Sequence, residues 1–430
     1  MNTRFYNAKI MTMEKDLEIF DGELWVQGSR VTYAGKAKSR EEIDKCAVKF
    51  DREYDAKGNL IMPGFKNAHA HTAMTALRSY ADDMKLQEWL ETMIFPVEAK
   101  MTGEDIYELT KLGVMEYLTS GITACFDMYL EPDDGARAYN DMGYRAVQVS
   151  GINKFGPSVS ELENRFLRLN NKYPLSSFML GFHAEYTCTK ELLQDISALV
   201  HKYKVPVYAH NSETESEVKD CIARYGMTPT EFFDSLGLYD FGGGGYHCVW
   251  MSDNDFEIFK KRNLSMVSNP GSNTKLASGI APLQRYLDEG INVALGTDGP
   301  SSNNCLDMFR EMFLATGLGK LREQDAAAVP ATEVIKMATT NGAAAMGLTD
   351  CTSIAPGKAA DLIVIDLHQP NMQPVHNIPV NLVYSGSKQN VKLTMVNGKI
   401  LYEDGNYNIG VDPDTVYANV ERITRRICTK

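Results

Sequence analysis

The middle of the chain alternates eight apolar, β-rich runs with helical segments, and this alternation restricts the fold more than any other feature. Helices are expected over residues 102–119, 255–262 and 332–346, and the first has Thr102 as its N-cap with Asp105 three residues later. Eight strands that each lead into a helix, with runs apolar enough to be buried on both faces, are typical of a (β/α)8 (TIM) barrel. The expected strands cover residues 60–62, 123–127, 145–150, 179–183, 205–210, 244–249, 264–268 and 293–297.

Both ends of the chain have a different sequence pattern, in which polar and apolar residues alternate between glycine-containing turns. Residues 5–55 show it first, and residues 361–366 and 391–401 show it again. We therefore expect an α/β protein whose two ends pair into one small β-sandwich domain beside the barrel. The expected division is a composite β-sandwich of residues 1–58 and 355–415, a catalytic barrel of residues 59–354, and a C-terminal helical tail of residues 416–430.

Residue types that bind metals follow several of the apolar runs. His69 and His71 follow the first run, and because side chains i and i+2 of a strand share a face, both imidazoles can reach one ion. His210 and His247 lie at the carboxyl ends of the fifth and sixth runs, and Asp298 directly follows the eighth. One histidine at a strand end is usually structural, but four of the 8 histidines occupy such positions here. Since the carboxyl ends of barrel strands form the active site, these residues predict a metal centre.

The predicted ligands are His69, His71, His210 and Asp298, which offer three neutral nitrogens and one anionic oxygen. This set suits Zn²⁺ first, with Fe²⁺ or Mn²⁺ as alternatives. The chain has no lysine at the end of the fourth run that could bridge two ions, so one divalent metal per subunit is expected. Such an ion lowers the pKa of a bound water and makes it a nucleophile near neutral pH.

Glu213, His247 and Asp298 are the predicted catalytic residues. Glu213 lies three residues after His210, where its carboxylate can take a proton from water and pass it to a substrate nitrogen. The alternative for Glu213 is an exposed loop carboxylate. His247 is expected to hydrogen-bond the nucleophile or the developing oxyanion, and Asp298 is expected to relay a proton as well as to bind the metal.

Charge and cysteine usage exclude some classes of protein. The formal net charge is −12 and there is no dense Lys/Arg block, which argues against a nucleic-acid or anionic-membrane partner. No stretch has the apolar length needed to cross a bilayer. The 8 cysteines form no CxxC pair and the N-terminus lacks an apolar signal core, so a cytoplasmic enzyme with a small-molecule substrate is expected.

Several segments together resemble one known family. They are Pro-Gly-Phe-Lys-Asn-Ala-His-Ala-His-Thr-Ala-Met at 63–74, Tyr-Ala-Asp-Asp at 80–83, Ser-Asn-Pro-Gly-Ser-Asn-Thr-Lys-Leu at 268–276, Gly-Thr-Asp-Gly-Pro-Ser-Ser-Asn-Asn at 296–304, and Gly-Lys-Ala-Ala-Asp-Leu at 357–362. With them the chain resembles the amidohydrolase superfamily and, within it, the 5-methylthioadenosine/S-adenosylhomocysteine deaminases. The resemblance implies a homo-oligomer that deaminates adenine nucleosides at C6, such as 5′-methylthioadenosine, S-adenosylhomocysteine, adenosine or 5′-deoxyadenosine, to the inosine analogue and ammonia.

The same likeness implies a set of substrate-binding residues. Glu98 would accept hydrogen bonds from the ribose hydroxyls, and His183 would approach the purine ring. Trp89 would line the pocket for the 5′ group, and Glu213 and Asp298 would contact the reacting end of the substrate. The alternatives are a helix-face charge for Glu98, a core histidine for His183 and a packing role for Trp89.

One departure from the family pattern bears on the substrate. Members that accept S-adenosylhomocysteine resemble one another in carrying arginines after the third strand, whereas this chain reads Val-Ser-Gly-Ile-Asn-Lys-Phe-Gly at 149–156. Lys154 is a point charge without the bidentate fork of arginine, so it should bind a carboxylate less well. Neutral 5′-substituted adenosines are therefore expected to be preferred.

Two other functions stay open on the sequence alone. An aminohydrolase or chlorohydrolase of a triazine, guanine or cytosine would use the same ligands and the same Glu213, but it would leave Glu98 without a task. A non-catalytic scaffold on this fold is the other possibility. The complete set of His69, His71, His210, Glu213, His247 and Asp298 argues against it.

Overall fold

The computed structural model describes residues 1–46 and 48–429, and its larger unit is a barrel of eight parallel strands. The strands follow one another in chain order, and the last approaches the first, where Asp298 N–H donates to the His69 carbonyl at 3.0 Å. The predicted TIM barrel is confirmed. Its strands are β6 (Phe65–Ala70), β7 (Ile122–Asp127), β8 (Arg145–Val149), β9 (Ser176–Gly181), β10 (Val207–Asn211), β11 (Gly243–His247), β12 (Ser265–Ser268) and β13 (Asn292–Leu295).

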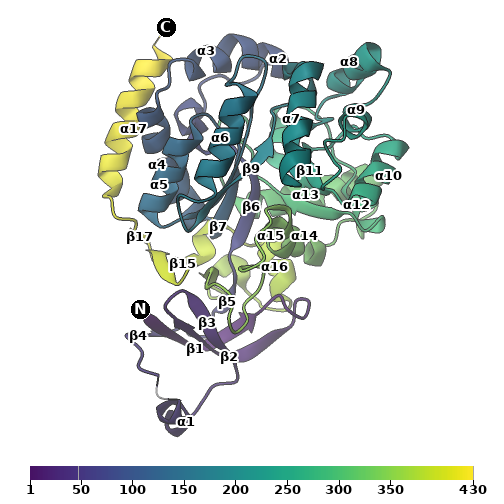
Figure 1. Cartoon of the computed structure of the whole chain (residues 1–430). Helices are drawn as coiled ribbons and strands as arrows, with labels where there is room; N and C mark the ends of the chain where they lie inside the picture. Colours follow the sequence, from purple (N-terminus) through teal and green to yellow (C-terminus); the bar gives the residue numbers. More distant parts are fainter. Residues whose placement is uncertain (47, 430) are drawn as a thin grey trace.

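The two chain ends form the second unit, as predicted, and its strands join in one mixed hydrogen-bonded sheet. The inward side chains of both halves of this sheet share an apolar core, which includes Phe5, Leu24 and Leu393. In Figure 1 the first strands of this sheet lie below the barrel. Its strands are β1 (Asn2–Met11), β2 (Ile19–Gln27), β3 (Arg30–Gly35), β4 (Arg52–Asp55), β5 (Leu60–Pro63), β14 (Leu362–Ile365), β15 (Val391–Val396), β16 (Lys399–Glu403) and β17 (Asn406–Tyr407).

One predicted barrel strand belongs to this sheet instead. Residues 60–62 were expected to open the barrel, but they lie in β5, which pairs in parallel with β1 and antiparallel with β14. The barrel starts with β6, directly after Gly64. The apolar run at 60–62 is buried by the neighbouring strands of the small sheet, and such burial looks the same in sequence as burial inside a barrel.

Most helices lie on the barrel, whereas the short helix of residues 40–45 lies beyond the small sheet (Figure 1). The predicted N-cap is confirmed, since the Thr102 hydroxyl accepts from Asp105 N–H and the Asp105 carboxylate accepts from Thr102 N–H. The predicted helix at 332–346 is broken at Thr339, which has φ −128° and ψ −92°. The helices are α1 (Arg40–Lys45), α2 (Leu86–Trp89), α3 (Phe95–Glu98), α4 (Gly103–Thr119), α5 (Pro132–Met142), α6 (Val159–Leu169), α7 (Lys190–Tyr203), α8 (Glu215–Tyr225), α9 (Pro229–Ser235), α10 (Asp253–Arg262), α11 (Pro270–Lys275), α12 (Leu283–Asp288), α13 (Met308–Glu323), α14 (Ala331–Ala338), α15 (Thr340–Ala345), α16 (Ile378–Tyr384) and α17 (Pro413–Cys428).

The C-terminal helix α17 runs along α4 (Figure 1). Arg426 of α17 forms an ion pair with Asp105, and Ile423 and Ile427 are buried against the barrel. The predicted helical tail thus packs on the barrel, and its last residue, Lys430, lies outside the described residues. The predicted residue limits of the units and the predicted homo-oligomer stay predictions. Among the described helices, none combines the length and apolar character needed to cross a membrane.

A buried ion pair connects the barrel to the small sheet. Arg145, at the start of β8, donates through Nε and Nη2 to the two carboxylate oxygens of Asp361 at 2.6 and 3.0 Å. Asp361 also accepts from Asn397 N–H at 2.7 Å, in the turn between β15 and β16. Although burial opposes ionisation, Arg145 holds the pKa of Asp361 below its ordinary value.

Replacing Arg145 should destabilise the protein, because the Arg145→Met substitution leaves the Asp361 charge buried without a partner. We expect a loss of about 3–5 kcal/mol in the free energy of unfolding, measured by urea denaturation. Arg168→Met is the matched control, since Arg168 pairs with Asp133 at the surface and should contribute less than about 1 kcal/mol. Equal losses for the two variants would contradict the connecting role of Arg145.

Candidate active site

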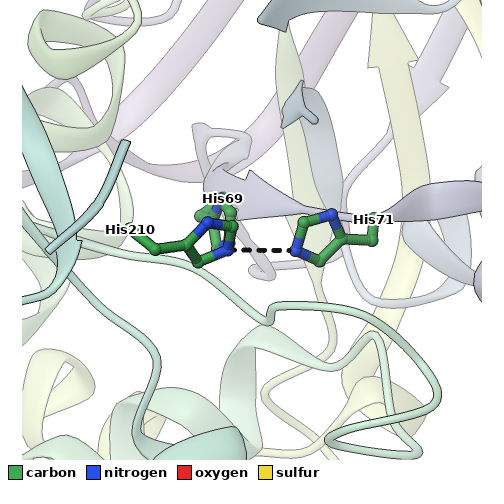
Figure 2. A group of neighbouring side chains, drawn as sticks. All are labelled: His69, His71 and His210. Atoms are coloured by element: carbon green, nitrogen blue, oxygen red, sulfur yellow. Dashed lines mark hydrogen bonds between the residues drawn. The ribbon is translucent and has the colours of Figure 1, made fainter. Parts of the chain in front are cut away.

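Three imidazoles converge at the carboxyl ends of the barrel strands (Figure 2). His69 lies near the end of β6 and His71 directly after it, beyond a register irregularity between Asn67 and Ala70. His210 comes from β10, and its Nε2 lies 3.3 Å from Nε2 of His71. The ligand atoms of His69, His71 and His210 all lie within 4.8 Å of one another. This spacing allows all three to bind one metal ion.

Asp298 adds a carboxylate to the same centre. Its Oδ1 lies 3.2 Å from Nε2 of His71 and 3.5 Å from Nε2 of His69. His247 Nε2 lies 3.9 Å from Asp298 Oδ2. Asp298 and His247 have left-handed φ values of 59° and 70°, which are uncommon for residues other than glycine. Such conformations concentrate at functional sites, where the surrounding structure imposes them.

Neighbouring groups orient three of the four histidines. In each case Nδ1 contacts an oxygen that can only accept, so Nδ1 donates this hydrogen bond and Nε2 is the nitrogen directed to the centre. The acceptors are the Met128 carbonyl for His71, the His183 carbonyl for His210 at 2.7 Å, and the Asn273 side-chain oxygen for His247 at 2.7 Å.

The protonation states agree with a ligand role. Burial lowers the pKa of His69 to about 3 and the pKa of His210 well below its ordinary value, so both rings are neutral. Burial alone would raise the pKa of Asp298, but contacts with His69 and His71 outweigh it and keep Asp298 ionised. Burial would lower the pKa of His71, yet the contact with Asp298 raises it to about 9. A bound cation would displace this proton.

The surroundings of His69 show whether these residues fit a metal ion. Its side chain is completely buried, and neither ring nitrogen has a hydrogen-bond partner among the described residues. Burying both ring nitrogens without hydrogen bonds destabilises the fold, unless another group such as a metal ion binds one of them. Three imidazoles and one carboxylate are a donor set that divalent zinc or iron accepts. The residues present therefore fit a divalent metal ion.

Glu213 lies next to this centre, on the loop between β10 and α8. Its Oε1 accepts a hydrogen bond from the Ser278 hydroxyl at 3.1 Å, and its Oε2 lies 3.9 Å from Nε2 of His247. The Glu217 carboxylate accepts from the backbone N–H of Glu213 at 2.7 Å and so fixes the loop. Burial raises the pKa of Glu213, which suits a group that both accepts and returns a proton.

A pocket of about 730 Å³ opens from the centre. Its walls are mainly apolar, and the predicted substrate-binding residues Glu98, His183 and Trp89 all line it. Desolvation raises the pKa of Glu98 to about 7. Trp89 donates from its indole N–H to the Ala81 carbonyl at 2.9 Å, which holds the ring in place. Every predicted site residue thus lies at this end of the barrel, with His69 beneath the pocket lining.

Several residues that hold this site were not predicted from the sequence. Ser272 and Ser302 donate to Asp298 Oδ2 at 2.6 and 2.9 Å, and Asn273 orients His247. All three lie in the segments 268–276 and 296–304, which carried the family resemblance. The resemblance of these segments to the family pointed to their importance. The contacts of their individual side chains could not be predicted, because these contacts depend on the packing of α11 against the loop after β13.

Comparisons with known proteins agree on one family. The sequence profile described as the amidohydrolase family matches residues 60–401. The chain is 37% identical to a 5-methylthioadenosine/S-adenosylhomocysteine deaminase of Thermoanaerobacter pseudethanolicus over 99% of both proteins, and 38% identical to a 5′-deoxyadenosine deaminase of Methanosarcina mazei over 93% of this chain and 92% of that protein. The crystal structure of an adenosine deaminase from Xanthomonas campestris with bound zinc superposes with a TM-score of 0.91 at 30% identity, covering 99% of this chain and 98% of that one.

Removing the buried imidazole should remove the metal. We expect the His69→Ala protein to retain much less zinc than the wild type after dialysis, because one of three nitrogen ligands is lost. The measurement is metal content by elemental analysis of the folded protein. His201→Ala is the matched control, since His201 is an exposed histidine paired with Asp240, and its zinc content should be unchanged. Full zinc retention by His69→Ala would show that the ion binds elsewhere.

Proposed function

Because the chain belongs to the amidohydrolase family, we propose that it catalyses the metal-dependent hydrolytic deamination of adenine nucleosides at C6. The products are the inosine analogue and ammonia. The observation that carries the proposal is a buried histidine–aspartate centre with the Glu213 carboxylate beside it, at the end of a pocket that Glu98 also lines. The relatives named above, which are deaminases of adenosine or of 5′-modified adenosines, support it further.

His69, His71, His210 and Asp298 would hold one divalent ion per chain, and Zn²⁺ is the ion we propose. The zinc bound to the related Xanthomonas campestris structure supports this choice, and Fe²⁺ or Mn²⁺ would suit the same donors. When bound, the ion supplies Lewis acidity that makes a water molecule acidic near neutral pH.

The chain's own residues move the protons. Glu213 takes a proton from the attacking water and gives it to the ring nitrogen beside C6, while the water oxygen bonds to C6. His247 donates through Nδ1 to Asn273, so its Nε2 accepts a hydrogen bond from that water and orients it. Asp298 then passes the remaining hydroxyl proton to the amino group. The C6–N bond breaks, ammonia leaves and a carbonyl remains at C6.

Glu98 and His183 would hold the nucleoside. The Glu98 carboxylate can accept from both vicinal ribose hydroxyls. Burial lowers the pKa of His183 to about 4, so its ring is neutral. The Nδ1 atom of His183 lies 3.1 Å from the Thr187 hydroxyl, which leaves Nε2 for a purine ring nitrogen. Trp89 would provide an apolar wall for the rest of the substrate.

The pocket rim supports a preference for neutral 5′ groups. Arg165 lines the pocket, but it already lies 3.2 Å from the Glu161 carboxylate and 3.7 Å from the Glu131 carboxylate. Lys154 lies over the ring of Phe155, with 5.1 Å from its Nζ to the ring centroid, and Phe155 is 83% exposed. A homocysteine carboxylate would therefore meet compensated or solvated cations. We propose that 5′-methylthioadenosine and 5′-deoxyadenosine are better substrates than S-adenosylhomocysteine.

Ammonia release from a substrate panel tests both the proposed substrate class and the proposed preference for neutral 5′ groups. We expect kcat/KM for 5′-methylthioadenosine and 5′-deoxyadenosine to exceed that for S-adenosylhomocysteine by about tenfold or more, equivalent to roughly 1.4 kcal/mol of transition-state binding. Guanine and a chlorotriazine should not react. Comparable efficiency on S-adenosylhomocysteine would refute the 5′ preference alone, whereas turnover of guanine or the triazine without turnover of nucleosides would refute the substrate class.

The Glu98→Gln variant tests whether the substrate is a nucleoside by changing the residue proposed to bind the ribose. It should raise KM for nucleosides, because a neutral amide accepts weaker hydrogen bonds from the ribose hydroxyls than a carboxylate does. Glu88→Gln, at an exposed position of α2, is the matched control. Unchanged turnover of the best substrate by Glu98→Gln would remove the argument for a ribose.

The proton-transfer role of Glu213 makes a separate prediction. The Glu213→Gln variant should lose about 10²- to 10⁴-fold in kcat while it keeps its metal, because glutamine cannot carry the proton. Glu215→Gln, two residues away at the exposed start of α8, should retain normal activity. A residual kcat near that of the wild type would show that another group transfers the proton.

A further inference from the structure

His69 differs from the other histidines of the centre in how its ring is held. The rings of His71, His210 and His247 are each fixed by a hydrogen bond from Nδ1 to a neighbouring oxygen. Neither nitrogen of His69 has a hydrogen-bond partner among the described residues. Since no hydrogen bond fixes the rotation of this ring, another contact must do so if the ring is to present a ligand atom.

That contact is the ring of Tyr246. The centroids of the His69 and Tyr246 rings lie 3.8 Å apart with an interplanar angle of 21°, so the two rings are stacked. Both side chains are completely buried in the barrel. A close stack of this kind opposes rotation of the imidazole out of its plane.

The backbone of β11 puts Tyr246 in this place. Successive residues of a strand normally point to opposite faces, yet Tyr246 and His247 both reach the interior of the barrel. The left-handed φ of 70° at His247 makes this possible. The strand is therefore shaped to direct both an aromatic ring and an imidazole to the centre.

The aromatic ring of Tyr246, and not its hydroxyl, makes this contact. The ring packs edge-on against Phe126, with centroids 5.8 Å apart at 80°, and this contact holds it in position. The hydroxyl is buried and has no partner among the described residues. A buried hydroxyl without a partner costs stability, so its removal should not harm the site.

We propose that Tyr246 is a positioning residue that fixes the His69 imidazole for metal binding by stacking against it. The inference rests on the proposed metal site and not on the identity of the substrate. It predicts that metal affinity depends on an aromatic ring at position 246 and does not depend on the hydroxyl. A purely structural role for Tyr246 would change stability without changing metal affinity.

The test compares Tyr246→Phe with Tyr246→Leu by competition for zinc with a chromogenic chelator, in the absence of any nucleoside. Tyr246→Phe should keep the zinc dissociation constant of the wild type. Tyr246→Leu should raise that constant about 10- to 100-fold, as is typical when a group that supports a ligand is lost. Saturating zinc should then restore kcat of Tyr246→Leu close to the wild-type value.

Tyr144→Leu is the matched control, because Tyr144 is another completely buried tyrosine whose hydroxyl bonds to the Ile122 carbonyl at 3.0 Å and whose ring packs against Tyr117 and Tyr139 instead of Tyr246. The proposal is overturned if Tyr144→Leu weakens zinc binding as much as Tyr246→Leu does, or if Tyr246→Leu binds zinc with the wild-type affinity. If Tyr246→Leu does not fold, Tyr246→Met replaces it. Failure of both to fold beside a folded Tyr246→Phe would also overturn the proposal, since the ring would then be a requirement of the fold. If the Tyr246 variants change the zinc dissociation constant as predicted but no variant and not even the wild type turns over nucleosides, the proposed function is refuted and this inference stands.

Discussion

The buried carboxylate of Asp298 is the constraint on which the rest of the site depends. A buried charge costs several kcal/mol unless partners compensate it, and Asp298 is only 5% exposed. Ser272 and Ser302 bind one of its oxygens, and the imidazoles of His69 and His71 face the other. A divalent cation is the natural completion of this arrangement. The donors come from opposite parts of the sequence, so only the closed barrel can bring them together.

The fold keeps these donors in place although some residues of the site are strained or lack hydrogen-bond partners. His247 and Asp298 adopt left-handed backbone conformations, and His69 lies buried without a hydrogen-bond partner among the described residues. Strained and unsatisfied groups persist only where the surrounding fold determines them. The surrounding fold includes a packed aromatic layer inside the barrel and the Arg145–Asp361 ion pair below it, which fixes the barrel to the small sheet.

The sequence predicted the features that depend on local pattern. Strand periodicity and turn position were sufficient for the barrel and for the gathering of His69, His71 and His210, because residues at strand ends of a barrel meet on one face. The assignment of residues 60–62 to the barrel was wrong, since an apolar run does not reveal which sheet buries it. The orienting contacts of Asn273 and Tyr246 could not be predicted, because they join elements far apart in the chain. The break at Thr339 is likewise a tertiary effect.

We propose that one metal ion in this centre makes the chain an adenine-nucleoside deaminase. A stepwise zinc titration of metal-depleted protein tests it most directly, with bound zinc and the rate of ammonia release from 5′-methylthioadenosine measured on the same samples. We expect both quantities to rise together and to level off at one zinc per chain. Ammonia release by the metal-free protein, or a full equivalent of bound zinc without any ammonia release, would contradict it.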